Sequence, residues 1–102
     1  MTSDPSERRA FDAVLSRGHV RVAVEVVTRL TDVQAQVRPI LLKQAAAHIP
    51  CMVLVLADSR LNARVVRDAA ATLLPAFPIA PRLTLRCLRG GEAPSGNGYV
   101  LA

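Results

Sequence analysis

The chain has 102 residues, 51% of them hydrophobic, which is enough for one domain with a modest, largely aliphatic core, since only two Phe and one Tyr are present. Thirteen basic residues against eight acidic ones give a net charge of +5, which favours weak attraction to polyanions. Two cysteines are too few for a disulfide scaffold, and every apolar run is too short to cross a bilayer.

The first residues, MTSDPSERR, are polar and lack the apolar core of a signal peptide. We expect residues 1–8 to be a disordered lead and residues 9–102 to form a single domain. The expected location is the cytoplasm, where Cys51 and Cys87 would be buried, reduced thiols, and no membrane partner is expected.

Residues 10–27 predict a β-hairpin that carries two acidic side chains. A first strand (AFDAVL), a tight turn (SRGH) and a second strand (VRVAVEVV) follow one another. With residues 17–18 as the loop, Asp12 would lie opposite Ala23, and Glu25 would be its diagonal neighbour on the same face, roughly 7 Å away. Two carboxylates would then converge. The alternative is that both are solvated on an exposed sheet face, or that Glu25 pairs with a neighbouring Arg.

The segment after the hairpin predicts a helix and then a buried strand. Thr31 and Gln34 have the spacing of a capping box, which indicates a helix start at Thr31. Pro39 lies inside this helix and predicts a kink or a break into two helices. Residues 52–57 form a continuous apolar run, which is typical of a strand buried on both faces beside a parallel neighbour. The order predicts a right-handed βαβ crossover.

A second helix is expected over residues 60–74, capped by Asp58 or Ser59. Its outer side carries three arginines at spacings of four and three: Arg60, Arg64 and Arg67. These side chains are candidates for phosphate contacts. The alternatives are a solvated face in which Arg64 pairs with Asp68, and a basic composition that reflects only Arg-rich codon usage.

The C-terminal part begins with a proline-containing loop and ends in a short strand. Residues 82–89 alternate as a strand would, but Pro81 at a first helical position and Gly90 just past the end favour a helix. We expect residues 90–98 to be a flexible loop and residues 99–102 to be a short strand at a sheet edge.

Taken together, the elements resemble the core of the restriction-endonuclease-like fold, the PD-(D/E)xK superfamily. Closer still, FDAV, VAVEVVTRLTDVQAQ, ILLK and VLVLADSRLN resemble the C-terminal domain of many actinobacterial regulators that begin with an XRE-type helix-turn-helix. The resemblance covers residues 9–102. It implies a small α/β domain with a mixed sheet, an N-terminal hairpin and flanking helices.

The resemblance also implies a site. Asp12 matches the first acid of the superfamily, Glu25 the second, Gln34 a helix glutamine near the active centre, and Lys43 a helix lysine. The corner after the central strand is matched by Asp58, Arg60 and Asn62. The lysine that normally follows the glutamate by two residues is replaced by Val27, which can neither orient a water nor stabilise charge on a phosphate.

Asp12 and Glu25 could still hold one Mg²⁺ through oxygen ligands, as a weak cation site. Lys43 could supply the missing charge, but we expect the helix to turn it away from the face that packs on the sheet. A metal without a cationic partner is a poor phosphodiesterase, so the sequence favours a relic site with no catalytic activity.

The predicted function is therefore a non-catalytic restriction-endonuclease-like domain with a regulatory, dimerising or accessory DNA-contacting role in transcriptional regulation. The alternatives are a Mg²⁺-dependent nuclease that uses Asp12, Glu25 and Lys43, and a protein-interaction module without nucleic acid. The resembled proteins place a helix-turn-helix, or a further helix and strand, before Asp12. We therefore expect a core truncated at the N-terminus, whose exposed hairpin edge pairs in a homodimer or with a helix-turn-helix-containing protein.

Overall fold

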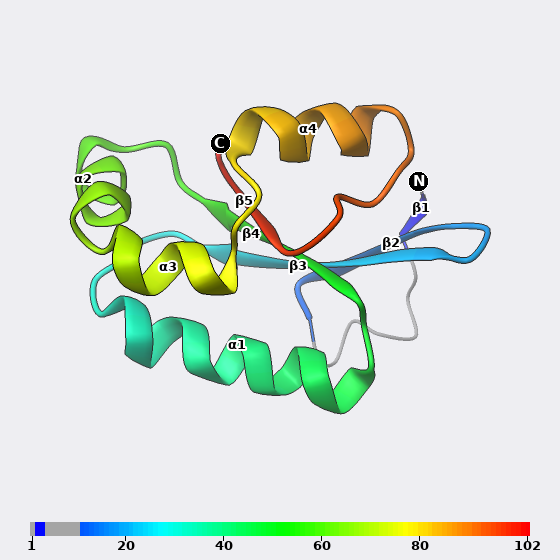
Figure 1. Ribbon diagram of the computed structural model, residues 1–102, viewed down its shortest axis with the longest axis horizontal. Coiled ribbons are helices and arrows are strands. Elements are labelled where there is room, and N and C mark those ends of the chain that lie inside the picture. Colours follow the sequence, from blue (N-terminus) through cyan, green and yellow to red (C-terminus); the bar gives the residue numbers. More distant parts are fainter. Residues whose placement is uncertain (1, 4–10) are drawn as a thin grey trace.

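The computed structural model describes residues 2–3 and 11–102, which form a mixed sheet covered by helices on both faces (Figure 1). The strands are β1 Thr2–Ser3, β2 Ala13–Arg17, β3 Val20–Val27, β4 Cys51–Leu56 and β5 Gly98–Leu101. The helices are α1 Val33–Ala47, α2 Arg60–Asp68, α3 Ala70–Ala76 and α4 Pro81–Arg89. The strand order is β1-β2-β3-β4-β5, antiparallel from β1 to β3 and parallel from β3 to β5. The predicted α/β class and mixed sheet are confirmed.

The hairpin forms, but its register differs from the predicted one. Arg17 pairs with Val20, so the two-residue loop begins one residue later than expected. Gly18 opens this loop with φ +59°, a left-handed conformation that glycine adopts without steric cost. The β2–β3 ladder ends at Ala13, so Asp12 lies just outside β2 instead of opposite a β3 residue.

Most of the predicted lead, residues 1–8, lies outside the described residues. Its described part, Thr2–Ser3, forms β1 and pairs with Ser16 and Leu15 of β2. This pairing covers part of the hairpin edge that was expected to be free for a second copy.

α1 crosses from β3 to β4, and these two strands pair in parallel, so the predicted βαβ unit is confirmed. The predicted capping box is wrong, because Asp32 is the N-cap and its carboxylate accepts a backbone N–H of the first turn at 3.1 Å. Gln36, and not Gln34, reaches back to accept the N–H of Thr31. α1 continues through Pro39, whose ring lies on the exposed side, so the predicted break does not occur.

The second predicted helix, residues 60–74, is in fact two helices, because α2 ends at Asp68 and α3 begins at Ala70. The predicted cap at Ser59 is confirmed. α4 confirms the helix preferred over a strand, with Pro81 in its first turn, and β5 confirms the edge strand. Within the described residues, no helix combines the length and the apolar character needed to cross a membrane.

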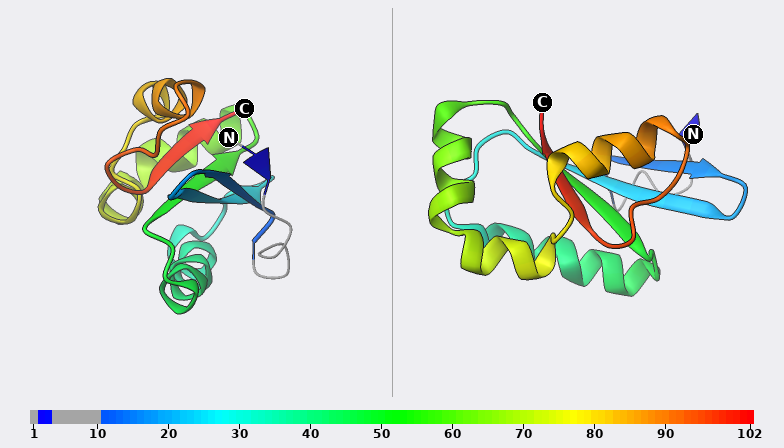
Figure 2. Two further views of the ribbon diagram at one scale, coloured as in Figure 1. Left: turned by 90° about the vertical axis from the view of Figure 1, so that its right-hand side faces the viewer. Right: turned by 45° about the horizontal axis from the view of Figure 1, so that its top comes forward.

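Aliphatic side chains fill both sides of the sheet. α1 and α3 lie on one side of the sheet and α4 lies on the other (Figure 2). The first side holds the larger cluster, which includes Leu54 and Phe77, and the second holds a smaller one around Val53. β4 is therefore buried on both faces, as predicted. Cys51 is buried and Cys87 partly buried, and both are free thiols. Burial, and then the neighbouring Cys87, raises the pKa of the Cys51 thiol to about 11, so this thiol stays protonated at neutral pH.

Candidate functional site

Glu25 and Lys43 form the centre of the candidate site. Glu25 lies near the carboxyl end of β3 and is only 7% exposed. Lys43 Nζ, which comes from α1, donates to Glu25 Oε1. The same ammonium lies 5.5 Å from the centroid of the buried Phe11 ring, within cation–π range.

The prediction that α1 turns Lys43 away from the sheet is therefore wrong. Lys43 follows Ile40 by three residues, which places the two side chains about 60° apart around the helix axis. Ile40 is buried against the sheet, and the long aliphatic stem of Lys43 covers the remaining distance while the residue stays partly exposed. A lysine at the margin of a buried face can thus reach a carboxylate beneath the helix.

Asp12 has a separate partner. Its Oδ2 accepts a hydrogen bond from the Val26 N–H at 2.7 Å. This N–H lies just beyond the last residue pair of β2 and β3, so the carboxylate replaces a strand carbonyl at the point where the ladder ends. Asp12 is exposed but has a structural role at the end of the hairpin.

A cation site at Asp12 and Glu25 has few protein ligands. In the described part of the chain, no group of three or more His, Cys, Asp or Glu side chains is placed to hold a metal ion. Mg²⁺ prefers octahedral oxygen coordination, so two carboxylates would leave most positions to water. Glu25 would also have to release Lys43, whose positive charge opposes a second cation nearby.

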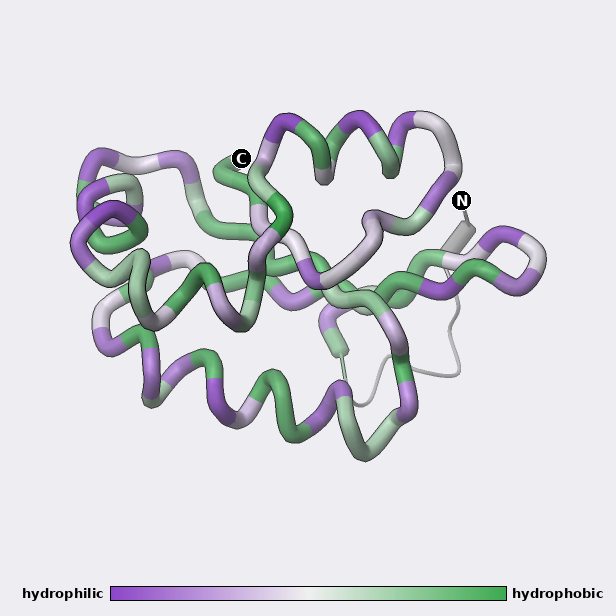
Figure 3. Tube along the Cα trace, in the orientation of Figure 1, coloured by the Kyte–Doolittle hydropathy of each residue, from purple (hydrophilic) through white to green (hydrophobic). Residues whose placement is uncertain are grey.

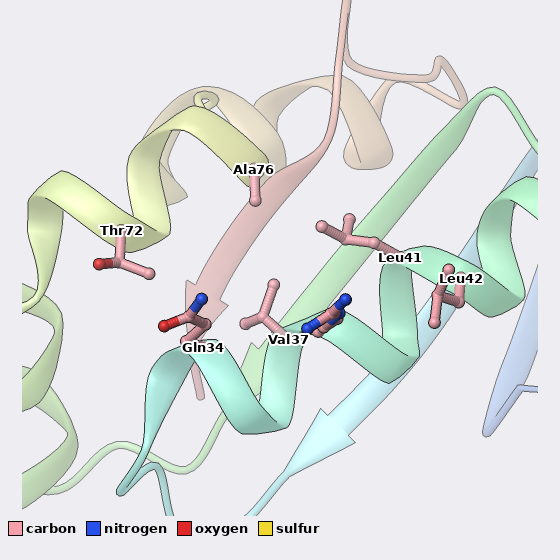
Figure 4. Close-up of a pocket in the computed structure, with 7 residues that line it drawn as sticks. Gln34, Val37, Leu41, Leu42, Thr72 and Ala76 are labelled. Carbon is pink, nitrogen blue, oxygen red and sulfur yellow. The ribbon is translucent and has the colours of Figure 1, made fainter.

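Gln34 is not part of this site. It is exposed in the first turn of α1, nine residues before Lys43, which corresponds to roughly 13 Å along the helix. Figure 4 shows that Gln34 instead faces Thr72 of α3. The residues that the resemblance implies for one centre are therefore distributed over different parts of the domain.

A groove runs between α1 and α3. One hollow of this groove has a volume of about 310 Å³ and is lined by Gln34, Val37, Arg38, Leu41, Leu42, Thr72 and Ala76 (Figure 4). A second hollow shares Gln34 and Thr72 with the first and extends towards Asp32. Leu42 beside the groove is 64% exposed, so an apolar surface lies open here.

Asn62, which belongs to the matched corner after the central strand, is 1% exposed and fully hydrogen-bonded. Its Oδ1 accepts the Leu30 N–H at 2.8 Å, and its Nδ2 donates to the carbonyls of Thr28 at 2.9 Å and Ala57 at 2.8 Å. These bonds join the loops that follow β3 and β4. Asn62 is therefore a positioning residue for the carboxyl end of the parallel sheet.

A second polar contact, which is partly buried, was missed from the sequence. Asn97 and Gln44 exchange two side-chain hydrogen bonds of 2.8 Å each, and Asn97 Oδ1 also accepts the Met52 N–H at 2.9 Å. The contact anchors the end of the loop that was predicted to be flexible. Its only signal in the sequence is an amide side chain between two glycines, which does not identify the partner.

The predicted arginine ridge is exposed. Arg60, Arg64 and Arg67 lie on α2 as solvent-facing side chains, and we call them the α2 ridge. Asp68 lies 3.9 Å from Arg67 Nε, so the expected pair with Arg64 is replaced by a contact with the adjacent arginine. Hydrophilic residues recur along α2 and also along α4 (Figure 3). Whether the ridge binds phosphate stays a prediction.

Comparison with protein-family models, with curated proteins and with solved structures gives no match for this chain in any of the three. A functional assignment therefore depends on the geometry described above.

Proposed function

We propose that this chain is a non-catalytic restriction-endonuclease-like domain with a regulatory, dimerising or accessory DNA-contacting role in transcriptional regulation. The order of hairpin, crossover helix and parallel strand supports the fold assignment. DNA, a second copy of the chain or a helix-turn-helix-containing protein would be its partners, and the cytoplasm its location.

The proposal rests on one observation. The acidic side chains of the candidate site have partners within the protein, whereas two arginines of the α2 ridge have no acidic partner in the described residues. Glu25 is bound by Lys43, and Asp12 is bound by the backbone of β3. Arg60 and Arg64, by contrast, are exposed and have no carboxylate partner within the described residues. Exposed guanidinium groups pair readily with phosphate.

Phosphodiester cleavage would require Asp12 and Glu25 to bind a metal ion instead of their present protein partners. A nuclease of this type holds a metal on its carboxylates and places a free cation beside the scissile phosphate. Here the only lysine of the chain already pairs with Glu25, and Val27 stands where a lysine is expected. Both acids are thus already bound by groups of the protein, which supports a structural role for the acid pair.

Dimerisation would use an edge of the sheet. The hairpin edge is partly covered by β1, so a second copy would have to pair beyond Thr2–Ser3 at that edge. Analytical ultracentrifugation tests this part of the proposal, and a strict monomer at high concentration would contradict it.

The test of the DNA-contacting role is a native gel with supercoiled plasmid in Mn²⁺, at low and moderate salt. We expect a retarded, intact plasmid at low salt and loss of retardation at moderate salt, because phosphate contacts release counterions. Nicking that disappears in Glu25→Ala would contradict the proposal. Absence of both retardation and nicking would contradict a DNA role altogether.

A Mg²⁺-dependent nuclease that uses Asp12, Glu25 and Lys43 is the second candidate, favoured by the contact between Lys43 and Glu25. In that case Glu25 would exchange Lys43 for a divalent cation, and the freed ammonium would stabilise the phosphate. This candidate predicts that Lys43→Ala abolishes nicking while leaving plasmid retardation largely unchanged.

A protein-interaction module is the third candidate, favoured by the groove between α1 and α3. The exposed Leu42 and the apolar lining are typical of a protein contact rather than a nucleic-acid contact. This candidate predicts neither retardation nor nicking of the plasmid.

A further inference from the structure

α4 carries a second arginine row that matches the α2 ridge in spacing. Arg82, Arg86 and Arg89 are all exposed, and we call them the α4 row. At about 100° per residue, these side chains fall within an arc of about 60°. The opposite side of α4 carries Thr84, which is 0% exposed, and Leu88, which packs on the smaller core cluster.

In the part of the chain that the structure describes, the α4 row has no acidic ion-pair partner. α4 itself contains no Asp or Glu, and Glu92 is the first acid after it. Within residues 2–3 and 11–102, no carboxylate forms an ion pair with any arginine of the row. The α2 ridge differs, because Asp58 precedes α2 and Asp68 lies 3.9 Å from Arg67.

A further arginine adds positive charge at the end of α4. Arg17 Nη1, at the tip of the hairpin, donates to the Gly90 carbonyl at 3.4 Å. A Cβ on Gly91 would lie 2.1 Å from the same Nη1 atom, so the hairpin tip approaches the helix end closely. The row and Arg17 together place four arginines along one helix and its C-terminal end.

α4 is held rigidly under this row. Thr84 Oγ1 donates to the Ile79 carbonyl at 3.1 Å. A Cβ on Gly98 would lie 2.2 Å from Thr84 Oγ1, so α4 sits directly against β5. A row fixed in this way loses little conformational freedom on binding, apart from that of its own side chains.

We propose that the α4 row, with Arg17 at its end, is the main surface that binds the phosphate backbone of double-stranded DNA, and that the α2 ridge contributes less. This inference rests on the proposed DNA-contacting function and assigns its surface. The row spans about 10 Å of helix axis, a length over which duplex DNA carries about six phosphate charges. Guanidinium groups bind phosphate with two parallel hydrogen bonds, which suits a row made only of arginine.

The same chemistry argues for DNA over an anionic membrane. A helix that lies in a membrane interface inserts its apolar face into the lipid. The inner face of α4, with Thr84 and Leu88, is already packed on the sheet and is not available for insertion. Leu83 and Leu85 of α4 are exposed, but they lie about 160° apart around the helix axis, on either side of the row, so they do not form one apolar face. The row therefore suits a rigid polyanion, and it offers phosphate contacts without sequence readout.

The test compares two matched triple variants of the full chain, Arg82→Ala/Arg86→Ala/Arg89→Ala and Arg60→Ala/Arg64→Ala/Arg67→Ala. Both lower the net charge by the same amount, and alanine preserves helix propensity. Fluorescence anisotropy with one duplex over a salt series gives the affinity and the salt slope. We expect the α4 variant to lose about tenfold or more in affinity at low salt and about 2 to 3 units of slope, and the α2 variant about 1 unit or less. Circular dichroism checks that both variants fold.

Each outcome separates this inference from the function on which it rests. Equal losses of affinity in the two variants would show that net charge alone determines DNA binding. A larger loss in the α2 variant would make the α2 ridge the main binding surface. Either result overturns the inference and leaves the DNA-contacting function intact. No binding by the unmodified chain overturns both. Binding to phosphatidylserine vesicles but not to the duplex, lost in the α4 variant, would reassign the row to a membrane surface.

Discussion

α2 and α4 are nine-residue helices with the same arginine spacing, and they differ in the bonds and charges around them. In each helix a small polar residue follows the first arginine by two positions and is buried, Asn62 at 1% and Thr84 at 0% exposed. The arginines lie on the opposite side in both cases. A buried polar residue on the inner face therefore anchors each helix, while the arginines face solvent.

The two helices are fixed by different means. Asn62 makes three side-chain hydrogen bonds that connect the loops after β3 and β4. Thr84 makes one, to Ile79, and relies on close packing against Gly98. The two helices therefore share the spacing of their arginines but differ in the acids that flank them, which are Asp58 and Asp68 at α2 and Glu92 after α4.

The largest expected effect is at Asn62. Asn62→Ala leaves one buried N–H and two carbonyls without their partner, and we expect a loss of about 3 kcal/mol in the free energy of unfolding, whereas Thr84→Ala should cost about 1 kcal/mol. Urea denaturation measures both. Leu61→Ala is the matched control, because Leu61 is 56% exposed on the same helix and should change little. An equal cost at Asn62 and Thr84 would break the comparison.

The contact between α4 and β5 gives the second effect. Gly98→Ala should cost about 2 kcal/mol, because the added methyl group overlaps Thr84 Oγ1. Gly96→Ala is the control, since its Cβ would meet its nearest neighbour at 3.8 Å, an ordinary contact. In a double-mutant cycle, the variant Gly98→Ala/Thr84→Ala should lose less free energy of unfolding than the sum of the two single variants. If the losses of the two single variants simply added up in the double variant, the close contact between Gly98 and Thr84 would not be what holds α4 on β5.

Much of the fold follows from local signals, and the errors have local reasons. α4 was predictable because Pro81 and Gly90 mark its two ends. The hairpin register was not, because a single Gly18 permits two loops, one with glycine second and one with glycine first. The cap of α1 was ambiguous because Thr31 and Asp32 are both good N-cap residues.

The candidate site was less predictable, because its contacts are tertiary. The strand pattern identified Asp12 and Glu25 but not their partners. The partner of Asp12 depends on where the hydrogen bonding between β2 and β3 ends, and the partner of Glu25 depends on how far the Lys43 side chain reaches. The break between α2 and α3 at Ala69 carries no glycine or proline to mark it. The α4 row was missed, although the helix expected over residues 82–89 already places Arg82, Arg86 and Arg89 within one narrow arc.

The third effect concerns the helix starts. Ser59 caps α2 by accepting an N–H of the first turn at 3.1 Å, whereas Ala80 at the start of α4 makes no side-chain cap within the described residues. Ser59→Ala should therefore lower the free energy of unfolding by about 1 kcal/mol. Ala80→Ser should raise it by about 0.5 kcal/mol, because Ala80 has the extended backbone of an N-cap. Thermal denaturation measures both variants. If the melting temperature shifted in the same direction in both, the proposed difference between the two helix starts would be wrong.

The smallest effect is an exchange of local charge between the two helices. Asp68→Asn removes the acid beside Arg67 and should strengthen DNA binding about twofold, whereas Leu85→Glu places a carboxylate four residues before Arg89 and should weaken it about threefold. Both side chains are exposed, so stability should change by less than about 0.5 kcal/mol. Anisotropy with the same duplex at low salt measures the two affinities. The two variants change the net charge by one unit each, in opposite directions. If net charge alone decided the affinity, their effects would therefore be equal and opposite. A larger change in affinity for the α4 variant would show that α4 is a binding surface and that the basic composition alone does not explain binding.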